Sequence, residues 1–288
     1  MTYIIILNYN GAADTEKCLT SIAKTKNAAY KTVVVDNHST DNSAKIIEKW
    51  IAEHANVSVT LLRAKKNMGY SGGNNIGIKF AMSKADCEYL WILNNDTEVD
   101  EYALANMIKK QQSTGCDGVG SAVLWHENRC KVQCVGGRLD EEEFCLNLVA
   151  EGVNTKELKP DLKILTLPGP SFLLTAKLIK AVGLLDESYF LYCEELELAF
   201  RAKKAGLSFC YAEDAFVYHK GSASAGKECT SYRDYHMTRS WLIFISRHLP
   251  KKRAKFITRQ KKIIITKLFH FHFKRAWAIY RAITEHDL

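Results

Sequence analysis

Short apolar runs alternate with amphipathic stretches along the first hundred residues. The runs are four to six residues long, rich in β-branched side chains and bounded by Asn, Asp or Gly, and they cover residues 3–7, 32–35, 57–62 and 89–93. Runs of this kind are typical of buried parallel strands. Between them, apolar residues recur three and four positions apart, which predicts helices over residues 15–25 and 42–54. We therefore expect a doubly wound α/β domain.

The pattern continues less regularly toward the carboxyl end. Further elements are expected at residues 100–110 (helix), 119–125 (strand), 176–182 (helix), 209–212 (strand) and 216–219 (strand). Another helix should end at Gly206, because glycine is favoured just after a helix. Residues 130–161 are irregular and hairpin-like, and we expect their acidic run, residues 140–143, to be a solvated loop.

Charge divides the chain into two parts. The 288 residues carry a net charge of +8, yet residues 235–284 hold 13 Lys and Arg and no Asp or Glu, which leaves 27 basic and 32 acidic residues elsewhere. We therefore expect a mildly acidic body, residues 1–225, and a basic helical extension, residues 226–288.

Aromatic residues recur within the basic extension. Starting from Ile265, apolar side chains follow at three- and four-residue steps at Phe269, Phe273, Trp277 and Tyr280. Basic side chains between aromatic ones favour a helix that lies on an anionic membrane surface. The alternatives are a helix packed on the body or against a second copy of the chain in a homodimer, and nucleic-acid binding, which we expect least.

Composition narrows the class of protein. With 47% hydrophobic and 25% charged residues, the chain is neither disordered nor fibrous. It contains no run of 18 apolar residues, and its first residues lack a basic segment, so we expect a cytosolic protein with no membrane span and no signal peptide. The nine scattered cysteines are expected to be reduced thiols. The set His126, Cys130, Cys134 and Cys145 has no Cys-x-x-Cys pair, which disfavours a structural zinc site.

Polar residues follow three of the predicted strands directly. They are Asn8 and Asn10, then Asp36 and Asn37, then Asn94, Asn95 and Asp96. Ligands of open α/β sheets bind at the carboxyl ends of the strands, so these residues are site candidates. A carboxylate fixed there is also a suitable oxygen ligand for Mg²⁺ or Mn²⁺. No glycine-rich phosphate cradle follows the first strand, which argues against a dinucleotide-binding enzyme, a P-loop protein and a nucleotidyltransferase.

Six segments carry a family resemblance. They are ILNYNG, VVVDNHSTD, NMGYSGGNNIGI, LWILNNDTEVD, YFLYCEELELAFRAKKAG and VYHKGSAS. In this order, over residues 3–248, the chain resembles the inverting glycosyltransferases of family 2, particularly their bacterial rhamnosyltransferase-like branch. The resemblance implies a GT-A fold, which has a mostly parallel, Rossmann-like central sheet flanked by helices. It also implies a nucleotide-diphosphate sugar donor and a divalent metal, Mg²⁺ or Mn²⁺.

The resemblance also suggests roles for individual residues. The donor-binding set would be Asn8, Asn10, Asp36, Asn37, Asn67, Gly69, Asn74, Asn94, Asn95 and Asp96. Asn94-Asn95-Asp96 stands where the family has its DXD motif, with Asn in place of the leading carboxylates. This leaves Asp96 as the principal metal ligand, with Glu98 as a second ligand and His219 near the metal or the diphosphate.

Glu194 and Glu195 match the acidic pair that supplies the family's catalytic base. Inversion requires one carboxylate opposite the leaving diphosphate, to take the proton of the acceptor hydroxyl. Glu195 is the favoured base and Glu194 the alternative, while Glu197 is expected to be a solvated charge near the start of its helix. The loop at residues 168–172 would border the acceptor side, or be an ordinary turn.

The function implied is transfer of a sugar to a hydroxyl of a growing, lipid-linked glycan at the cytoplasmic face of the membrane. Rhamnose from dTDP-rhamnose is the favoured donor by resemblance, and UDP-hexose, UDP-N-acetylhexosamine and UDP-galactofuranose are alternatives. A non-catalytic scaffold that binds membrane or nucleic acid through its tail is the competing class. Residues 126–165 are candidates for shaping the acceptor site.

Overall fold

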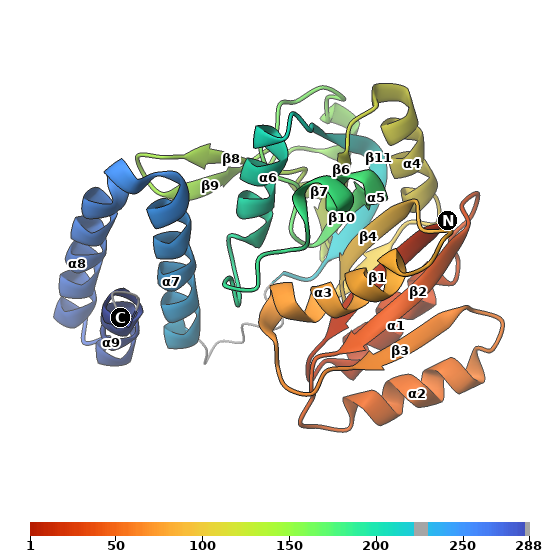
Figure 1. Ribbon diagram of the computed structural model, residues 1–288, viewed down its shortest axis with the longest axis horizontal. Helices are drawn as coiled ribbons and strands as arrows, with labels where there is room; N and C mark the ends of the chain where they lie inside the picture. The colour runs from red at the N-terminus through yellow and green to blue at the C-terminus, as the bar shows by residue number, and fades with distance from the viewer. Residues whose placement is uncertain (222–229, 286–288) are drawn as a thin grey trace.

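A nine-stranded sheet forms the centre of the computed structural model, which describes residues 1–221 and 230–285 (Figure 1). Its path is β3-β2-β1-β4-β10-β6-β11-β5, and β7 pairs with β6 outside this path. The strands are β1 (Thr2–Asn8), β2 (Tyr30–Asp36), β3 (Val59–Arg63), β4 (Tyr89–Asn94), β5 (Thr97–Val99), β6 (Gly118–Trp125), β7 (Asn128–Cys134), β10 (Ser171–Thr175) and β11 (Phe209–His219). The four strands expected in the first hundred residues are confirmed.

Parallel pairing brings the polar residues after these strands to one edge. β1 pairs in parallel with β2 and with β4, so that Asn8 lies beside Asp36 and Leu7 beside Asn94. β2 pairs in parallel with β3. Strands in parallel register end together, and the polar residues therefore share the carboxyl edge of the sheet.

Helices cover both faces of the sheet because the buried strands are apolar on both sides. Ile4 and Ile6 of β1 pack in one cluster with residues of α1 (Ala12–Ile22), α2 (Ser43–Glu53) and α4 (Ala103–Thr114). Tyr3 and Ile5 point the other way, into a cluster with α3 (Gly69–Met82), α5 (Ala176–Val182) and α6 (Glu194–Lys204). The predicted α/β class, with helices on both sides of the sheet, is confirmed.

One central strand was not expected. β10 occupies Ser171–Thr175, pairs antiparallel with both β4 and β6, and begins inside the segment predicted to be a loop. Its five residues follow Pro-Gly-Pro, and that turn signal obscured the short strand. The two strands expected at residues 209–219 are a single strand, β11, whose register shifts between Ala212 and Phe216.

One further expectation is wrong and another is incomplete. Cys116 and Cys210 form a disulfide, so the cysteines are not all reduced thiols. The acidic run lies in the hairpin of β8 (Gly137–Asp140) and β9 (Cys145–Leu148). Its side chains are exposed to solvent, as expected, but they also form ion pairs with basic side chains of the extension. Lys252 lies 2.9 Å from both Glu141 and Glu142, while Lys255 pairs with Glu142 and Arg259 with Glu143.

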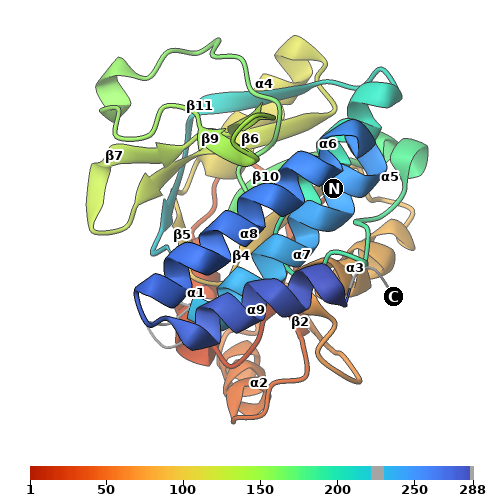
Figure 2. The ribbon, with the colours of Figure 1, turned by 90° about the vertical axis from the view of Figure 1, so that its left-hand side faces the viewer.

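The extension contains three longer helices beside the body, α7 (Thr230–His248), α8 (Arg253–Phe269) and α9 (Phe273–Thr284) (Figure 2). A short helical turn, η3 (Pro250–Lys252), joins α7 to α8, and another, η1 (Thr155–Glu157), follows the hairpin. Leu242 and Phe244 of α7 and Phe256 of α8 share a core cluster with Leu196 of α6 and Phe144 of the hairpin. Within the described residues, no helix is both long and apolar enough to cross a membrane. The helix α7 and the start of α8 are therefore packed on the body, while α9 packs against α7 and α8.

Candidate active site

The first polar cluster joins the ends of β1 and β2. Asn8 Nδ2 donates to Asp36 Oδ1 at 2.9 Å and to Ser39 Oγ at 3.1 Å, and Ser39 Oγ donates to Asp36 Oδ1 at 2.5 Å. Thr15 of α1 donates to Asn8 Oδ1 at 2.9 Å. Asn10 lies beside this cluster, exposed, and its Oδ1 accepts from the backbone N–H of Thr40. Asn8 and Asp36 are thus held in fixed orientations at the edge of the sheet.

The second cluster connects β2 to the start of α3. Asn37 Nδ2 donates to Asn67 Oδ1 at 3.0 Å and to the carbonyl of Gly69 at 3.1 Å. Gly69 has a φ of +68°, and a Cβ there would collide with Phe190, so glycine is required on both counts. Asn74, one turn further on, donates to the carbonyl of Tyr70 at 3.0 Å, and its Oδ1 is buried with no hydrogen-bond partner among the described residues.

The turn after β4 uses its two asparagines differently. Asn95 Nδ2 donates to the Gly11 carbonyl at 3.2 Å and to Thr15 Oγ1 at 3.1 Å, so its side chain anchors the start of α1. The backbone N–H of Asn94 donates to the Pro170 carbonyl at 2.9 Å. The turn is therefore fixed to both α1 and the loop before β10.

Asp96 lies beside His219, the last residue of β11. Oδ1 of Asp96 is 3.3 Å from Nε2 of His219, and both residues are buried. The other ring nitrogen, Nδ1, is 2.7 Å from Oε1 of Gln133 on β7. Two residues far apart in sequence thus present an oxygen and a nitrogen to one point at the sheet edge.

Two other charged residues near this pair, Glu98 and Lys220, have partners of their own. Glu98 contacts His126 at 2.9 Å through Oε1 and Arg129 at 2.6 Å through Oε2. Both carboxylate oxygens are thereby engaged, and the structure does not bring Glu98 into a set with Asp96. Lys220 pairs with Asp14 of α1. Nowhere in residues 1–221 and 230–285 do three or more His, Cys, Asp or Glu side chains gather as a metal site.

Glu194 and Glu195 begin α6 after two strained residues. Tyr192 and Cys193 have φ values of +72° and +68°, a conformation that is costly for residues with a Cβ and that concentrates at functional sites. Glu194 is only 3% exposed, and its Oε2 has no hydrogen-bond partner among the described residues. Glu195 remains partly exposed. Of the two residues, Glu195 is therefore the more accessible to solvent.

Burial changes the acidity of both carboxyl groups. Desolvation raises the pKa of Glu194 well above its ordinary value, and the neighbouring Glu195 charge raises it further. Desolvation also raises the pKa of Glu195, to about 7. A carboxylate with a pKa near neutrality is a stronger base than an ordinary glutamate, which suits general base catalysis.

Contacts with the loop before β10 place Glu195 near the Asp96 turn. A Cβ added to Gly169 would lie 2.5 Å from Glu195 Oε1, so the backbone of Gly169 is directly against this carboxylate. Tyr70 of α3 donates its hydroxyl to the Gly169 carbonyl at 3.0 Å. Because Pro170 in turn accepts from the N–H of Asn94, one loop connects the carboxylate pair to the end of β4.

Comparison with known proteins identifies the family. Residues 3–131 match the model of glycosyl transferase family 2. This part of the chain is therefore a family 2 glycosyltransferase domain. The low-salt glycan biosynthesis hexosyltransferase of Haloferax volcanii is 23% identical over 237 residues, which cover 81% of this chain and 71% of the relative. The N-acetylglucosaminyl-diphospho-decaprenol L-rhamnosyltransferase of Mycobacterium tuberculosis is 32% identical over 82 residues, 28% of this chain and 27% of the relative.

A solved structure supports the fold of this glycosyltransferase. The mannosyltransferase of Pyrobaculum calidifontis, in complex with GDP-Man and Mn²⁺, superposes with a TM-score of 0.58 at 14% sequence identity. The match covers 99% of this chain and 86% of the mannosyltransferase. The GT-A fold expected from the resemblance is therefore confirmed.

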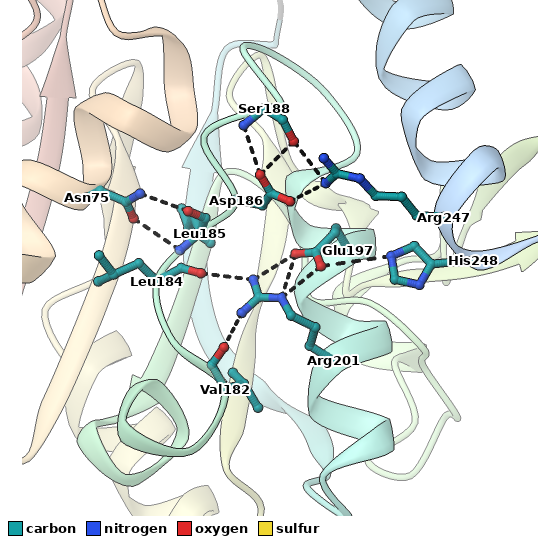
Figure 3. A network of polar contacts seen from close by, with 10 residues as sticks. All are labelled: Asn75, Val182, Leu184, Leu185, Asp186, Ser188, Glu197, Arg201, Arg247 and His248. Carbon is teal, nitrogen blue, oxygen red and sulfur yellow. Dashed lines mark hydrogen bonds and ion pairs between the residues drawn. The ribbon is translucent and has the colours of Figure 1, made fainter.

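A buried ion-pair network supports the helix of the transferase that carries the carboxylate pair (Figure 3). Glu197 is buried and accepts from Arg201 Nε at 2.8 Å through both oxygens, which corrects the expectation of a solvated charge. Arg201 also donates to the carbonyls of Val182 and Leu184. Arg247 of α7 pairs with Asp186 in the same loop, so that α6, α7 and this loop are fixed to one another.

Sequence reasoning missed four side chains of the transferase's sheet edge. Ser39 and Tyr70 closely follow predicted site residues in the sequence. This position, together with their hydrogen-bonding side chains, could have identified them as site residues. Thr15 was assigned only to a helix, and Gln133 lay in the irregular region without any distinguishing pattern. That region also contains a pocket of about 460 Å³, lined by Arg138, Val149, Lys159 and neighbouring side chains, which includes none of the predicted site residues.

Proposed function

We propose that this transferase moves a sugar, with inversion, from a nucleotide-diphosphate donor to a hydroxyl of a glycan acceptor. The observation that carries the proposal is the placement of the accessible Glu195 carboxylate, through Gly169 and Pro170, beside the turn that holds Asp96. A base on one side and a diphosphate site on the other is the arrangement that inversion requires.

The donor would bind along the edge formed by the two polar clusters. Asp36 and Asn8 are the candidates for the base and ribose, with Asn10, Asn37, Asn67, Gly69 and Asn74 beside them. Their fixed hydrogen bonds support a preorganised site, which lowers the entropic cost of binding. Asn94 and Asn95 would act by holding the turn.

Rhamnose from dTDP-rhamnose is the donor we favour, and the similarity to the mycobacterial rhamnosyltransferase supports it. UDP-hexose, UDP-N-acetylhexosamine and UDP-galactofuranose are the alternatives. Thermal-shift titration with dTDP, UDP and GDP separates dTDP-rhamnose from the UDP-sugars as a group, because a ligand that binds the native state raises its melting temperature.

Asp96 and His219 fit a divalent metal by the chemistry of their donor atoms. Asp96 Oδ1 and His219 Nε2 lie 3.3 Å apart, so one cation could contact both atoms. A carboxylate oxygen together with an imidazole nitrogen suits Mn²⁺ and suits Mg²⁺ less well. When bound there, the metal would neutralise charge on the diphosphate.

The chain's own residues would carry the proton transfer. Glu195 accepts the proton of the acceptor hydroxyl while that oxygen bonds to the anomeric carbon. The bond from that carbon to the diphosphate oxygen breaks on the opposite face, and the nucleoside diphosphate leaves with the electron pair. Tyr70 and Gly169 would orient Glu195, and the raised pKa of Tyr70, due to its burial, keeps the phenol protonated as a donor.

Substitution of the base tests this assignment. Glu195→Gln should lower kcat by roughly 10²- to 10⁴-fold, since a positioned general base contributes about that much. Donor affinity should be unchanged. Glu98→Gln is a matched control, because Glu98 is engaged with His126 and Arg129, and it should retain activity close to that of the unaltered protein. Equal kcat for Glu195→Gln and the unaltered protein would refute the role of Glu195.

We also propose that the enzyme works at the inner face of the cell membrane, on a lipid-linked acceptor. Seven large apolar side chains gather, exposed, at the end of α8 and along α9: Ile265, Leu268, Phe269, Phe271, Phe273, Trp277 and Tyr280. We call these seven the aromatic edge. Phe269 and Phe271 are 78% and 79% exposed. Contiguous apolar exposure of this kind marks an interaction surface.

Charge near the aromatic edge favours an anionic membrane as the partner. Lys261, Lys262 and Lys274 are exposed beside it. Three lysines near an anionic leaflet contribute about 3 kcal/mol to binding. Lys267 and Arg275 instead form ion pairs with Asp234. The turn between α8 and α9 lies at the same end of the helical unit as the start of α7, away from the β8–β9 hairpin (Figures 1 and 2).

Vesicle binding tests the membrane proposal without removing the extension, since α8 contributes Phe256 to the core. The combined change Phe269→Ser, Phe271→Ser and Trp277→Ser should abolish sedimentation with phosphatidylglycerol vesicles. Tyr102→Ser, at another exposed aromatic residue, is the control and should bind normally. Unchanged binding by the triple variant would refute the proposal, as would a stable dimer in sedimentation velocity that buries the aromatic edge.

A further inference from the structure

We infer that Tyr232, near the start of α7, is a saccharide-binding residue against which a sugar ring of the acceptor stacks. The inference rests on the proposed function, because it assigns a contact to the acceptor of that reaction. The sequence placed Tyr232 only in the basic extension, and its position beside the body comes from the tertiary structure.

Tyr232 is the most exposed of three aromatic rings in contact. Phe190 stacks on His236, with ring centroids 4.9 Å apart and ring planes 22° apart. His236 and Tyr232 lie four residues apart on one face of α7, and their ring centroids are 4.3 Å apart. Phe190 and His236 are half-buried, whereas Tyr232 is 47% exposed. The two inner rings therefore hold the outer ring in place and leave part of its surface accessible.

The inner end of this aromatic stack lies against the candidate active site. The carbonyl of Phe190 accepts from the backbone N–H of Tyr70 at 2.7 Å. A Cβ added to Gly69 would lie 2.7 Å from the ring of Phe190. The hydroxyl of Tyr70 donates to Gly169, whose backbone is directly against Glu195. The stack therefore begins at the start of α3, beside the residues that contact the proposed base.

Hydrogen bonds fix α7 to the segment that leads into α6. Ser240 donates its hydroxyl to the carbonyl of Leu191 at 2.7 Å, and Arg239 donates to the carbonyl of Ser188 at 2.8 Å. Both carbonyls belong to the segment that precedes the carboxylate pair. The position of Tyr232 relative to this segment is therefore set by the fold, as a binding residue for a defined ligand requires.

The first turns of α7 also contact the end of the extension that carries the aromatic edge. Asp234, two residues after Tyr232, pairs with Lys267 of α8 at 3.4 Å and with Arg275 of α9 at 2.6 Å. The same part of α7 thus connects the turn between α8 and α9 to the stack beside the active site. An acceptor anchored at the aromatic edge would pass Tyr232 on its way to Glu195.

The chemistry of an exposed tyrosine suits an uncharged sugar ring. A pyranose presents C–H groups on its faces and hydroxyl groups around its rim. The face of an aromatic ring carries partial negative charge, which attracts C–H groups, and the tyrosine hydroxyl can donate to or accept from a sugar hydroxyl. Burial, and to a smaller extent the charge of Arg239, lowers the pKa of His236 to about 4. The ring that supports Tyr232 is therefore uncharged near neutral pH.

Saturation-transfer NMR with methyl glycosides of glucose, galactose, N-acetylglucosamine and rhamnose tests the inference. The ring C–H protons of at least one glycoside should receive saturation from the unaltered protein. Tyr232→Ala should weaken the binding of that glycoside by about 2- to 10-fold, the range expected for loss of an aromatic contact. Tyr232→Phe keeps the ring and should bind with the affinity of the unaltered protein.

Tyr102→Ala is the matched control, because Tyr102 is 40% exposed and lies at the start of α4. It should bind the glycoside normally. Thermal unfolding checks that each variant is folded. Equal affinity of Tyr232→Ala and the unaltered protein would overturn the inference, as would the absence of saturation with all four glycosides. Loss of vesicle binding by Tyr232→Ala with unchanged glycoside affinity would assign Tyr232 to the membrane surface instead.

Thermal-shift titration with nucleotides tests the donor site separately. A protein that binds a methyl glycoside through Tyr232 but no nucleotide would lose the proposed function and keep this assignment of Tyr232. A protein that binds a nucleotide but no glycoside would keep its donor site, and the assignment of Tyr232 would be wrong.

Discussion

Replacing Gly169 by alanine should lower kcat while changing the free energy of unfolding little. The added Cβ would lie 2.5 Å from Glu195 Oε1, where an ordinary van der Waals contact begins at 3.4 Å. The carboxylate oxygen must therefore retreat by roughly 0.9 Å along that direction. Because the oxygen is at the free end of a flexible side chain, the retreat costs little folding free energy, and Gly169 has no positive φ that alanine would strain.

The catalytic cost of the same retreat is large. A misplacement of about 1 Å in a reacting group lowers the rate by roughly 10²-fold. We therefore expect Gly169→Ala to reduce kcat by about two orders of magnitude. The KM for the donor should change little, because Gly169 contacts Glu195 and not the polar clusters at β1 and β2.

A donor-hydrolysis or glycosyl-transfer assay over a range of donor concentrations measures both constants, and thermal unfolding measures the stability. Glu195→Asp provides a sharper comparison, since its shorter side chain leaves room for the added methyl group. The loss caused by Gly169→Ala should be smaller in the Glu195→Asp background than in the unaltered protein. A folded Gly169→Ala variant with a kcat within twofold of the unaltered protein would refute this reasoning.

Two other predictions concern the buried carboxylates of α6. Burial raises the pKa of Glu194, so its ionisation opposes folding and stability is lost as pH rises from about 4.5 through the folded pKa. Glu194→Gln removes this loss, and its melting temperature should exceed that of the unaltered protein increasingly between about pH 5 and pH 8; a constant difference would contradict the assignment. Arg201→Met leaves the Glu197 carboxylate without its ion-pair partner while its side chain is only 5% exposed. The substitution should therefore lower the free energy of unfolding by about 3 kcal/mol. Calorimetry should show a smaller loss of unfolding free energy for Arg201→Met in a Glu197→Gln background than in the unaltered protein. Equal losses in the two backgrounds would show that the ion pair is not the cause.

The sequence by itself determined the parallel half of the sheet. Strands β1 to β4 follow from short β-branched runs, and the helices between them from three- and four-residue periodicity, because both signals arise from neighbouring residues. The polar residues at the strand ends were located for the same reason, since parallel strands bring their carboxyl ends to one edge. The family resemblance then directed attention to Asp96, His219 and the Glu194-Glu195 pair.

The partners of these residues were decided only by the tertiary structure. Gln133 meets His219 across 86 positions of sequence, and Glu142 meets Lys252 across 110. Local periodicity carries no information about such pairs, because they form only when separate elements pack. The acidic run, expected to be solvated, therefore pairs with the extension, and Glu98, expected to bind metal, pairs with His126 and Arg129.

The basic extension shows both contributions at once. Its periodicity located an apolar stripe from Ile265 to Tyr280, but periodicity alone cannot distinguish a stripe that packs on the body from one that faces outward. The packing of α9 determines which of its side chains are buried and which face outward. Ala276, Ile279 and Ile283 fill the inner face of α9, so Phe273, Trp277 and Tyr280 remain exposed on the outer face. The helix α9 buries this one face against α7 and α8, and the aromatic residues on the opposite face are left for another partner.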